Sequence, residues 1–174
     1  MKTNIITTAT AIAPLLISLC LLACSPAMAQ KPGRPDTPSA VPTSSGQLVY
    51  VPVYPSIYYL GQKKSLELTV TLSIHNISPD SNITLESVKY FNKKGKLIKS
   101  ILASPKVLTP FETTSFVVTD KKDPGGVGAN FLVSWKADHK VNRPVIQAIM
   151  IATTGSQGIS FLTDGVPVRS LQTP

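Results

Sequence analysis

The sequence has few of the side chains that catalysis, metal binding and covalent cross-linking require. Its 174 residues include two cysteines, two histidines, and nine aspartates and glutamates. Both cysteines, Cys20 and Cys24, lie near the N-terminus, so the remaining chain has no thiol for a disulfide, a zinc site or nucleophilic catalysis. His75 and His139 are far apart in the sequence and belong to no catalytic motif. We therefore expect no catalytic site, no metal and no cofactor.

Long apolar runs and helical patterns are also scarce. Only one apolar stretch approaches the roughly 20 residues that a membrane-spanning helix needs, which excludes a multi-pass membrane protein. The charged fraction is 15% and the hydrophobic fraction is 43%, a balance that disfavours a wholly disordered chain. No window of about 10–12 residues combines helical periodicity with capping residues. The length fits one folded domain.

The N-terminal thirty residues resemble an export signal. The apolar run over residues 12–22 has the length of the core of a secretory signal peptide. Residues 21–24 resemble a bacterial lipobox, in which Cys24 is lipidated and becomes the new N-terminus after removal of residues 1–23 as a signal peptide. A second site, Ala27-Met28-Ala29, fits ordinary signal peptidase. The alternative to a lipoprotein is therefore a soluble exported protein cleaved after Ala29.

Residues 24–46 have the composition of a tether. They contain five prolines among serine, threonine, glycine, lysine and arginine, with almost no apolar side chains. Such a segment cannot recover its ordering entropy by burial and favours an extended, semi-rigid spacer. We expect it to hold a folded domain of residues 47–170 away from its anchor.

From residue 47 onward the dominant pattern is strict alternation. Residues 66–75 alternate apolar and polar side chains, which predicts a half-buried antiparallel strand. Residues 83–90 predict a second strand with a bulge near Ser87, and residues 92–95 predict a hairpin turn into 96–102. Further strand-like runs cover residues 48–54, 113–119, 129–136, 145–153 and 158–162. We predict an all-β fold, a single immunoglobulin-like antiparallel β-sandwich of about 7–8 strands, with a closed barrel as the alternative.

Several blocks of this region resemble an uncharacterised bacterial exported-protein family, domain of unknown function 3124. The blocks are residues 49–54 with Ile57 and Tyr58, residues 68–76, residues 125–131 with Trp135, and residues 157–161. His75 departs from the arginine that is more usual in the second block. The resemblance covers about residues 48–166. It implies a small, single-domain exported bacterial protein and implies no activity.

The clearest predicted surface feature is basic. Six lysines occur within eighteen residues that contain no Asp or Glu; they are Lys89, Lys93, Lys94, Lys96, Lys99 and Lys106. Lysines at a hairpin protect a strand edge against aggregation, or they bind an anionic partner such as phospholipid, lipopolysaccharide or an acidic polymer. The stretch has no arginine and few aromatics, so we do not expect nucleic acid. Lys93, Lys94 and Lys96 are candidate binding residues.

A second candidate surface is aromatic. Four tyrosines lie within ten residues, Tyr50, Tyr54, Tyr58 and Tyr59, and Tyr50 and Tyr54 share strand parity. Tyrosines suit binding surfaces because they combine apolar area with a polar tip, but they also line ordinary cores. Trp135 offers a further ring for ligand stacking. Residues 138–140, which include His139, are expected to form a loop between strands, where a solvated histidine is ordinary.

The sequence therefore favours a non-enzymatic exported lipoprotein of the cell envelope, anchored by Cys24 and facing the periplasm or the cell surface. Its expected role is binding or assembly, with an envelope protein or an anionic envelope surface as partner. The alternative is a soluble periplasmic protein that binds a small molecule or a carbohydrate through the tyrosines or Trp135. A third reading is an unrecognised hydrolase.

Overall fold

The computed structural model describes residues 41–118, 127–153 and 158–171. The predicted signal peptide, Cys24 and most of the predicted tether lie outside the described residues. All described residues belong to one compact unit, Ala40–Pro174. Within the described ranges there are twelve strands and no helix, so no helix there is long and apolar enough to cross a membrane.

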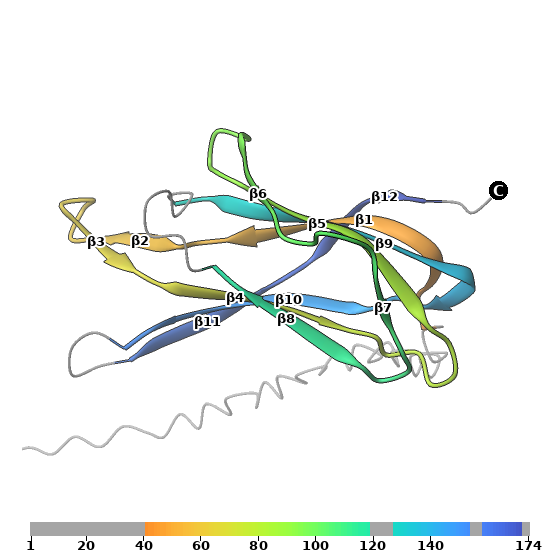
Figure 1. Ribbon diagram of the computed structural model, residues 1–174. Coiled ribbons are helices and arrows are strands. Elements are labelled where there is room, and N and C mark those ends of the chain that lie inside the picture. Colours follow the sequence, from red (N-terminus) through yellow and green to blue (C-terminus); the bar gives the residue numbers. More distant parts are fainter. Residues whose placement is uncertain (1–40, 119–126, 154–157, 172–174) are drawn as a thin grey trace, which may run out of the picture. The chain divides into compact units, whose positions relative to one another are not determined.

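The strands form two antiparallel sheets that lie face to face (Figure 1). The larger sheet contains, in spatial order, β12 (Val166–Ser170), β1 (Thr43–Val53), β9 (Ala129–Asn142), β5 (Ile83–Phe91) and β6 (Leu97–Ser100), and β7 (Lys106–Leu108) pairs with another part of β5. The smaller sheet contains β11 (Ile159–Asp164), β10 (Val145–Ala152), β4 (Thr69–His75) and β8 (Thr113–Val117). A separate two-stranded ribbon consists of β2 (Ser56–Tyr59) and β3 (Lys64–Glu67).

The core lies between the two sheets and is built from alternate residues of the central strands. β1 contributes Val49, Val51 and Val53, and β4 contributes Val70, Leu72 and Ile74, all buried. β9 adds Phe131, Val133 and Trp135, which have no exposed surface. Each such apolar side chain stabilises the fold by about 1.5–3 kcal/mol. The period of two in the sequence is therefore the direct cause of the two-layer architecture.

The structure confirms an all-β, antiparallel architecture. The bulge predicted near Ser87 is confirmed, because the register between β5 and β9 shifts between Leu85 and Ser87. The turn over residues 92–95 and the strand over residues 145–153 are also confirmed. Twelve strands exceed the predicted seven or eight, and the immunoglobulin-like topology stays a prediction.

Two local predictions are wrong. The single strand expected over residues 66–75 is interrupted at Leu68. Its amide donates to the carbonyl oxygen of Pro55 at 2.8 Å, but the proline has no N–H to return a ladder bond. The loop expected at residues 138–140 lies within β9. There the register with β1 shifts between Ser44 and Gly46, so β9 continues through an irregularity and pairs again at Val141.

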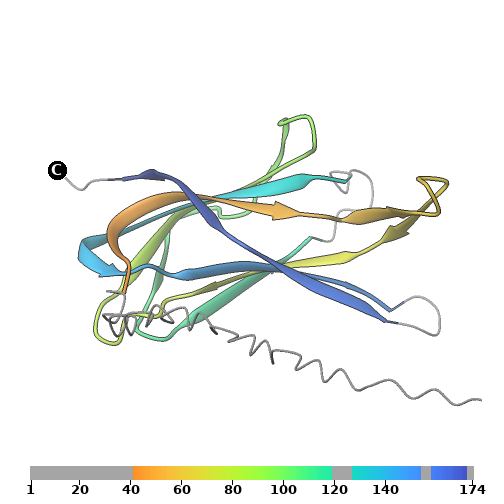
Figure 2. The same cartoon turned by 180° about the vertical axis from the view of Figure 1, so that it is seen from behind.

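The last two strands connect the sheets. β11 belongs to the smaller sheet and β12 to the larger one, and only Gly165 separates them (Figure 2). A Cβ atom at Gly165 would lie 2.7 Å from Cγ1 of Val49. The backbone amide of Gly165 donates to the carbonyl oxygen of Ile146 at 2.8 Å. Close to this crossing, the Thr163 hydroxyl donates to the carbonyl oxygen of Pro52 at 2.6 Å. The segment that crosses between the sheets therefore packs closely against β1, and glycine at position 165 leaves room for this close approach.

Candidate functional site

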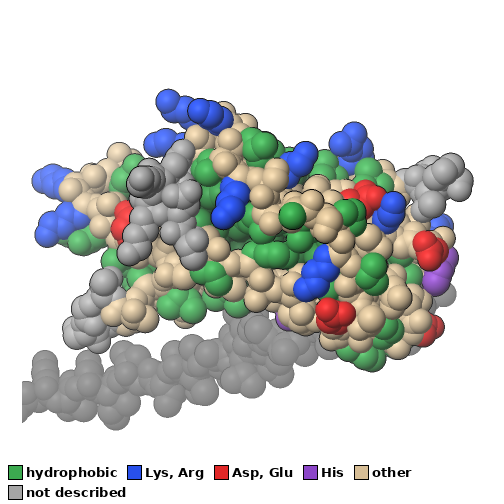
Figure 3. Space-filling view, viewed as in Figure 1, with side chains coloured by type: hydrophobic (Ala, Val, Ile, Leu, Met, Phe, Trp, Pro, Cys, Tyr) green, Lys and Arg blue, Asp and Glu red, His purple; other side chains and the backbone are tan. Residues whose placement is uncertain are grey.

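The predicted lysine hairpin exists, and Asn92 fixes its turn. The side-chain Oδ1 of Asn92 accepts hydrogen bonds from the amides of Lys94 at 3.0 Å and Lys96 at 3.1 Å. Its carbonyl oxygen accepts from the amide of Gly95 at 2.9 Å, and Gly95 has a left-handed φ of 73°. This geometry leaves the side chains of Lys93, Lys94 and Lys96 exposed. Figure 3 shows basic side chains projecting around the β5–β6 turn at the top of the view.

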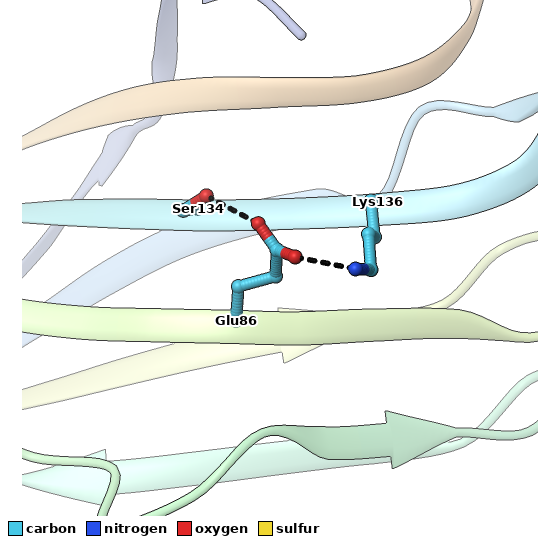
Figure 4. A network of polar contacts seen from close by, with 3 residues as sticks. All are labelled: Glu86, Ser134 and Lys136. Atoms are coloured by element: carbon cyan, nitrogen blue, oxygen red, sulfur yellow. Dashed lines mark hydrogen bonds and ion pairs between the residues drawn. The ribbon is translucent and has the colours of Figure 1, made fainter. Parts of the chain in front are cut away.

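These lysines have no carboxylate partner among the described residues. In the described part of the chain, the one ion pair joins Lys136 to Glu86 at 2.7 Å, away from the turn (Figure 4). Ser134 also donates to the Glu86 carboxylate, at 3.4 Å. The bond to Glu86 raises the pKa of Lys136. The positive charge of the hairpin is therefore solvated and available to an external anion.

The positions of the lysines distinguish between protection of a strand edge and binding of an anion. β6 is an edge strand of the larger sheet, so Lys99, within β6, fits protection of an exposed edge. Lys93 and Lys94 lie in the turn itself, beyond the last ladder pair of β5 and β6. They have no strand edge to protect. The turn lysines therefore favour a binding role over edge protection.

The three candidate tyrosines do not form one surface. Tyr50 is half-buried in β1, where it pairs with Leu132 of β9 and Val166 of β12. Tyr54 follows the end of β1 and packs against Phe161, with ring centroids 6.1 Å apart. Half-buried and buried residues alternate from Leu48 to Tyr54, so Tyr50 and Tyr54 keep the shared parity that the sequence predicts, although β1 ends at Val53. Tyr58 is 51% exposed but lies in the separate β2–β3 ribbon.

Trp135 is not available to a ligand at the surface. Its side chain is fully buried between the sheets, and it pairs in the ladder with Gln47 and Leu85. The expectation that this ring stacks on a ligand is therefore wrong. The indole Nε1 has no hydrogen-bond partner among the described residues. Trp135 is a core residue.

The structure brings together one polar cluster that sequence reasoning missed. The Ser81 hydroxyl donates to the Asp80 carboxylate at 2.7 Å and lies 3.1 Å from Nε2 of His139. Ser78 donates to the same carboxylate at 3.3 Å, and these hydroxyl bonds lower the pKa of Asp80. No spacing signal predicts the cluster, because His139 is 58 residues from Ser81 and reaches it only through the β9 irregularity.

This cluster has the residue types of a catalytic triad in the wrong order. In a triad the histidine accepts the serine proton and the carboxylate orients the histidine. Here the Ser81 proton points to Asp80, so Nε2 of His139 must donate to the Ser81 oxygen and leaves no base facing the hydroxyl. Ser81 is also buried. The arrangement fits a structural network that joins β9 to the loop before β5.

His75 has an equally ordinary environment. Its Nε2 lies 2.8 Å from the Ser73 hydroxyl, and its Nδ1 lies 2.8 Å from the Thr113 hydroxyl. Both ring nitrogens thereby have a hydroxyl partner. Among the described residues, no group of three or more His, Cys, Asp or Glu side chains is placed to hold a metal ion.

The sequence predicts Tyr58 as a candidate binding residue but does not predict the β2–β3 ribbon that carries it. The tip of this ribbon exposes three adjacent large apolar side chains, Tyr58 at 51%, Tyr59 at 46% and Leu60 at 64%. Lys63 and Lys64 follow after Gly61 and Gln62 and are exposed. The signal in the sequence is the run Tyr-Tyr-Leu-Gly ahead of two lysines, which lacks the usual residues of a two-residue hairpin turn.

Comparisons with known proteins agree with the resemblance of the sequence blocks. The sequence profile of a family described as "Protein of unknown function (DUF3124)" matches residues 46–168. A search of curated proteins finds no match. The crystal structure of Thermotoga maritima 1070 is similar over 71% of this chain and 94% of that chain, with a TM-score of 0.42 and 10% sequence identity. A likeness at this level supports no inference about fold or function.

Proposed function

The chain belongs to the family described as Protein of unknown function (DUF3124), and we propose that it is a non-enzymatic exported lipoprotein that binds an anionic partner in the cell envelope. In this proposal Cys24 carries the lipid, residues 24–46 form the tether, and the two sheets form an immunoglobulin-like sandwich. The domain faces the periplasm or the cell surface.

The observation that supports the binding role is the placement of Lys93 and Lys94. Their ammonium groups lie at an exposed turn, have no carboxylate partner among the described residues and protect no strand edge. The full chain carries a formal net charge of +8, so the protein as a whole attracts anions as well. A local cluster on a basic protein steers and holds an anionic surface.

Reversal of the cluster tests this role. Replacing Lys93, Lys94 and Lys96 by Glu should abolish binding to vesicles that contain phosphatidylglycerol. The residues are exposed, so the variant should keep the thermal stability of the parent protein. Unchanged binding would remove the anionic contact from the proposal. Replacement of Asn92 is unsuitable here, because it would disturb the turn.

The anchor is tested by the intact mass of the mature protein purified from its native host. A mass that begins at Cys24 and includes a diacylglycerol and a fatty acyl group supports the lipoprotein. A mass that begins at Gln30 overturns it and favours the soluble periplasmic alternative. That alternative can no longer depend on Trp135, which is buried.

A further inference from the structure

The β2–β3 ribbon exposes apolar surface that folding does not use. Among the strands that the structure describes, β2 and β3 pair only with each other, with Tyr58 opposite Ser65 and Tyr59 opposite Lys64. Successive residues of a strand point to opposite faces, so Tyr58 and Tyr59 point away from each other. Both are nevertheless about half exposed, 51% and 46%, because neither sheet covers the tip. Figure 1 shows the ribbon at the left end of the two layers.

The residue choice at the tip is unfavourable for the turn itself. Leu60, Gly61 and Gln62 all have left-handed φ values, 51°, 62° and 67°. Glycine or asparagine adopts this conformation readily, whereas a leucine pays a steric penalty. Leu60 is 64% exposed, so its side chain does not recover that penalty by packing within the described domain. An exposed apolar side chain in a strained turn is more typical of a surface that contacts a partner than of a turn that only connects two strands.

Charge surrounds these apolar residues on the same end of the molecule. Lys63 and Lys64 directly follow the tip, and the one carboxylate of the ribbon, Glu67, lies at its base opposite Ser56. The β5–β6 turn extends from the same end, because Pro52, Asn130 and Phe91 are in register across β1, β9 and β5. After Pro52 the chain continues to the β2–β3 ribbon, and after Phe91 it continues to the lysine turn. Figure 3 shows basic side chains both at the left tip and at the top of this view.

We propose that the tip of the β2–β3 ribbon docks on an anionic phospholipid bilayer, with Tyr58, Tyr59 and Leu60 in the interfacial layer and Lys63 and Lys64 on the headgroups. Tyrosine favours the headgroup level of a membrane, and lysines gain free energy near anionic lipid. A protein partner fits less well, since lysine is depleted at the centre of protein–protein interfaces. This inference rests on the proposed function and names the anionic surface that it leaves open.

Vesicle binding by the unlipidated chain that starts at Gln30 tests the inference. This chain lacks Cys24 but retains the compact unit Ala40–Pro174, which holds every described core residue. It should bind vesicles of phosphatidylcholine and phosphatidylglycerol in equal parts and should not bind vesicles of phosphatidylcholine alone. Replacing Tyr58, Tyr59 and Leu60 together by Ser should weaken binding about tenfold or more. Replacing Lys63 and Lys64 by Gln should weaken it about thirtyfold at low salt.

Matched variants control for charge and hydrophobicity. Lys140 and Arg143 are exposed at the opposite end of β9, and replacing both by Gln removes the same charge. Val166 and Val168 are each 56% exposed on β12, and replacing both by Ser removes exposed apolar area elsewhere. Both control variants should bind within about threefold of the parent chain.

The outcomes separate this inference from the proposed function. If the tip variant binds like the parent while charge reversal at Lys93, Lys94 and Lys96 abolishes binding, the docking tip is overturned and the anionic contact stands. If the parent chain binds no anionic vesicle, the bilayer is overturned as partner and a protein partner becomes the better occupant. The mass measurement at Cys24 decides the anchor independently of either result.

Discussion

Asn76 directly follows β4 of the smaller sheet and Leu108 ends β7 of the larger sheet, and a hydrogen bond joins them: Nδ2 of Asn76 donates to the carbonyl oxygen of Leu108 at 3.1 Å. The same amide donates to the carbonyl oxygens of Ser81 at 2.8 Å and Thr109 at 2.9 Å. Its Oδ1 accepts from the amide of Ser78 at 3.0 Å. One buried side chain therefore binds four backbone groups in two segments, residues 78–81 and residues 108–109.

Replacing Asn76 by Ala should lower the free energy of unfolding by about 2–4 kcal/mol, because several buried backbone groups lose their partner. Urea denaturation measures this loss. Asn92→Ala is the control, since Asn92 also binds backbone amides but does so at an exposed turn; it should cost about 1 kcal/mol or less. Equal losses in the two variants would contradict the role given to Asn76.

Replacing Gly165 by Ala should destabilise the domain by about 1–3 kcal/mol. The new Cβ would lie 2.7 Å from Cγ1 of Val49 and 3.0 Å from the carbonyl oxygen of Ile146. Gly158→Ala is the matched control, because the nearest atom to its new Cβ is 3.8 Å away. Thermal unfolding of both variants measures the difference. A Gly165→Ala protein as stable as the control would show that the sheet crossing tolerates a side chain.

Replacing Phe111 by Gly should raise stability by about 0.5–1 kcal/mol. Phe111 has a φ of 60° in the turn that the bond from the Glu112 amide to the Thr109 carbonyl closes at 3.0 Å. Its side chain is 69% exposed, so its removal loses little burial. Phe111→Ala keeps the strained conformation and should show no gain. A less stable Phe111→Gly protein in chemical denaturation would mean that the ring stabilises the fold.

The melting temperature should fall as the pH decreases below 4.5, the ordinary pKa of a glutamate. The amide and hydroxyl of Thr109 donate to the Glu112 carboxylate at 2.9 and 3.0 Å and lower the pKa of Glu112 in the folded protein. A carboxyl with a lower pKa when folded stabilises above its unfolded pKa and loses this contribution as pH falls through its folded pKa. Asp80 acts in the same direction.

Glu112→Gln provides the comparison for this pH series. The variant lacks the titrating group at position 112, so its melting temperature should fall less over the same acidic range. Part of the decrease should remain because Asp80 still titrates. Identical pH profiles for the two proteins would contradict a stabilising role for the ionised Glu112.

The sequence predicts the parts of the fold that depend on alternation. The phase break at Ser87 is readable because apolar parity changes there, and the structure places a bulge at that position. β12 is not readable, since all five of its side chains are exposed and pairing with β1 alone defines it. Alternation also fails at the β2–β3 ribbon, where Leu60 and Gln62 adopt conformations that their residue types do not favour.

The candidate site is likewise predictable only where a local sequence pattern determines the structure. The lysine turn is predictable because Asn92 and Gly95 are ordinary turn residues and the charges are contiguous in the sequence. The burial of Trp135 is also readable from alternation, because Trp135 shares its face of β9 with Phe131 and Val133, whereas the other face carries Ser134 and Lys136. The contact between Ser81 and His139 depends on a register shift in β9 that no local pattern indicates.

The chain contains one tryptophan, and it lies in the core rather than at either hairpin. Its intrinsic fluorescence therefore reports only the integrity of the space between the two sheets. Emission from Trp135 should shift to longer wavelength when the domain unfolds and should stay unchanged when a hairpin meets its partner. Emission from Trp135 thus follows folding without interference from binding, and binding needs a probe of its own.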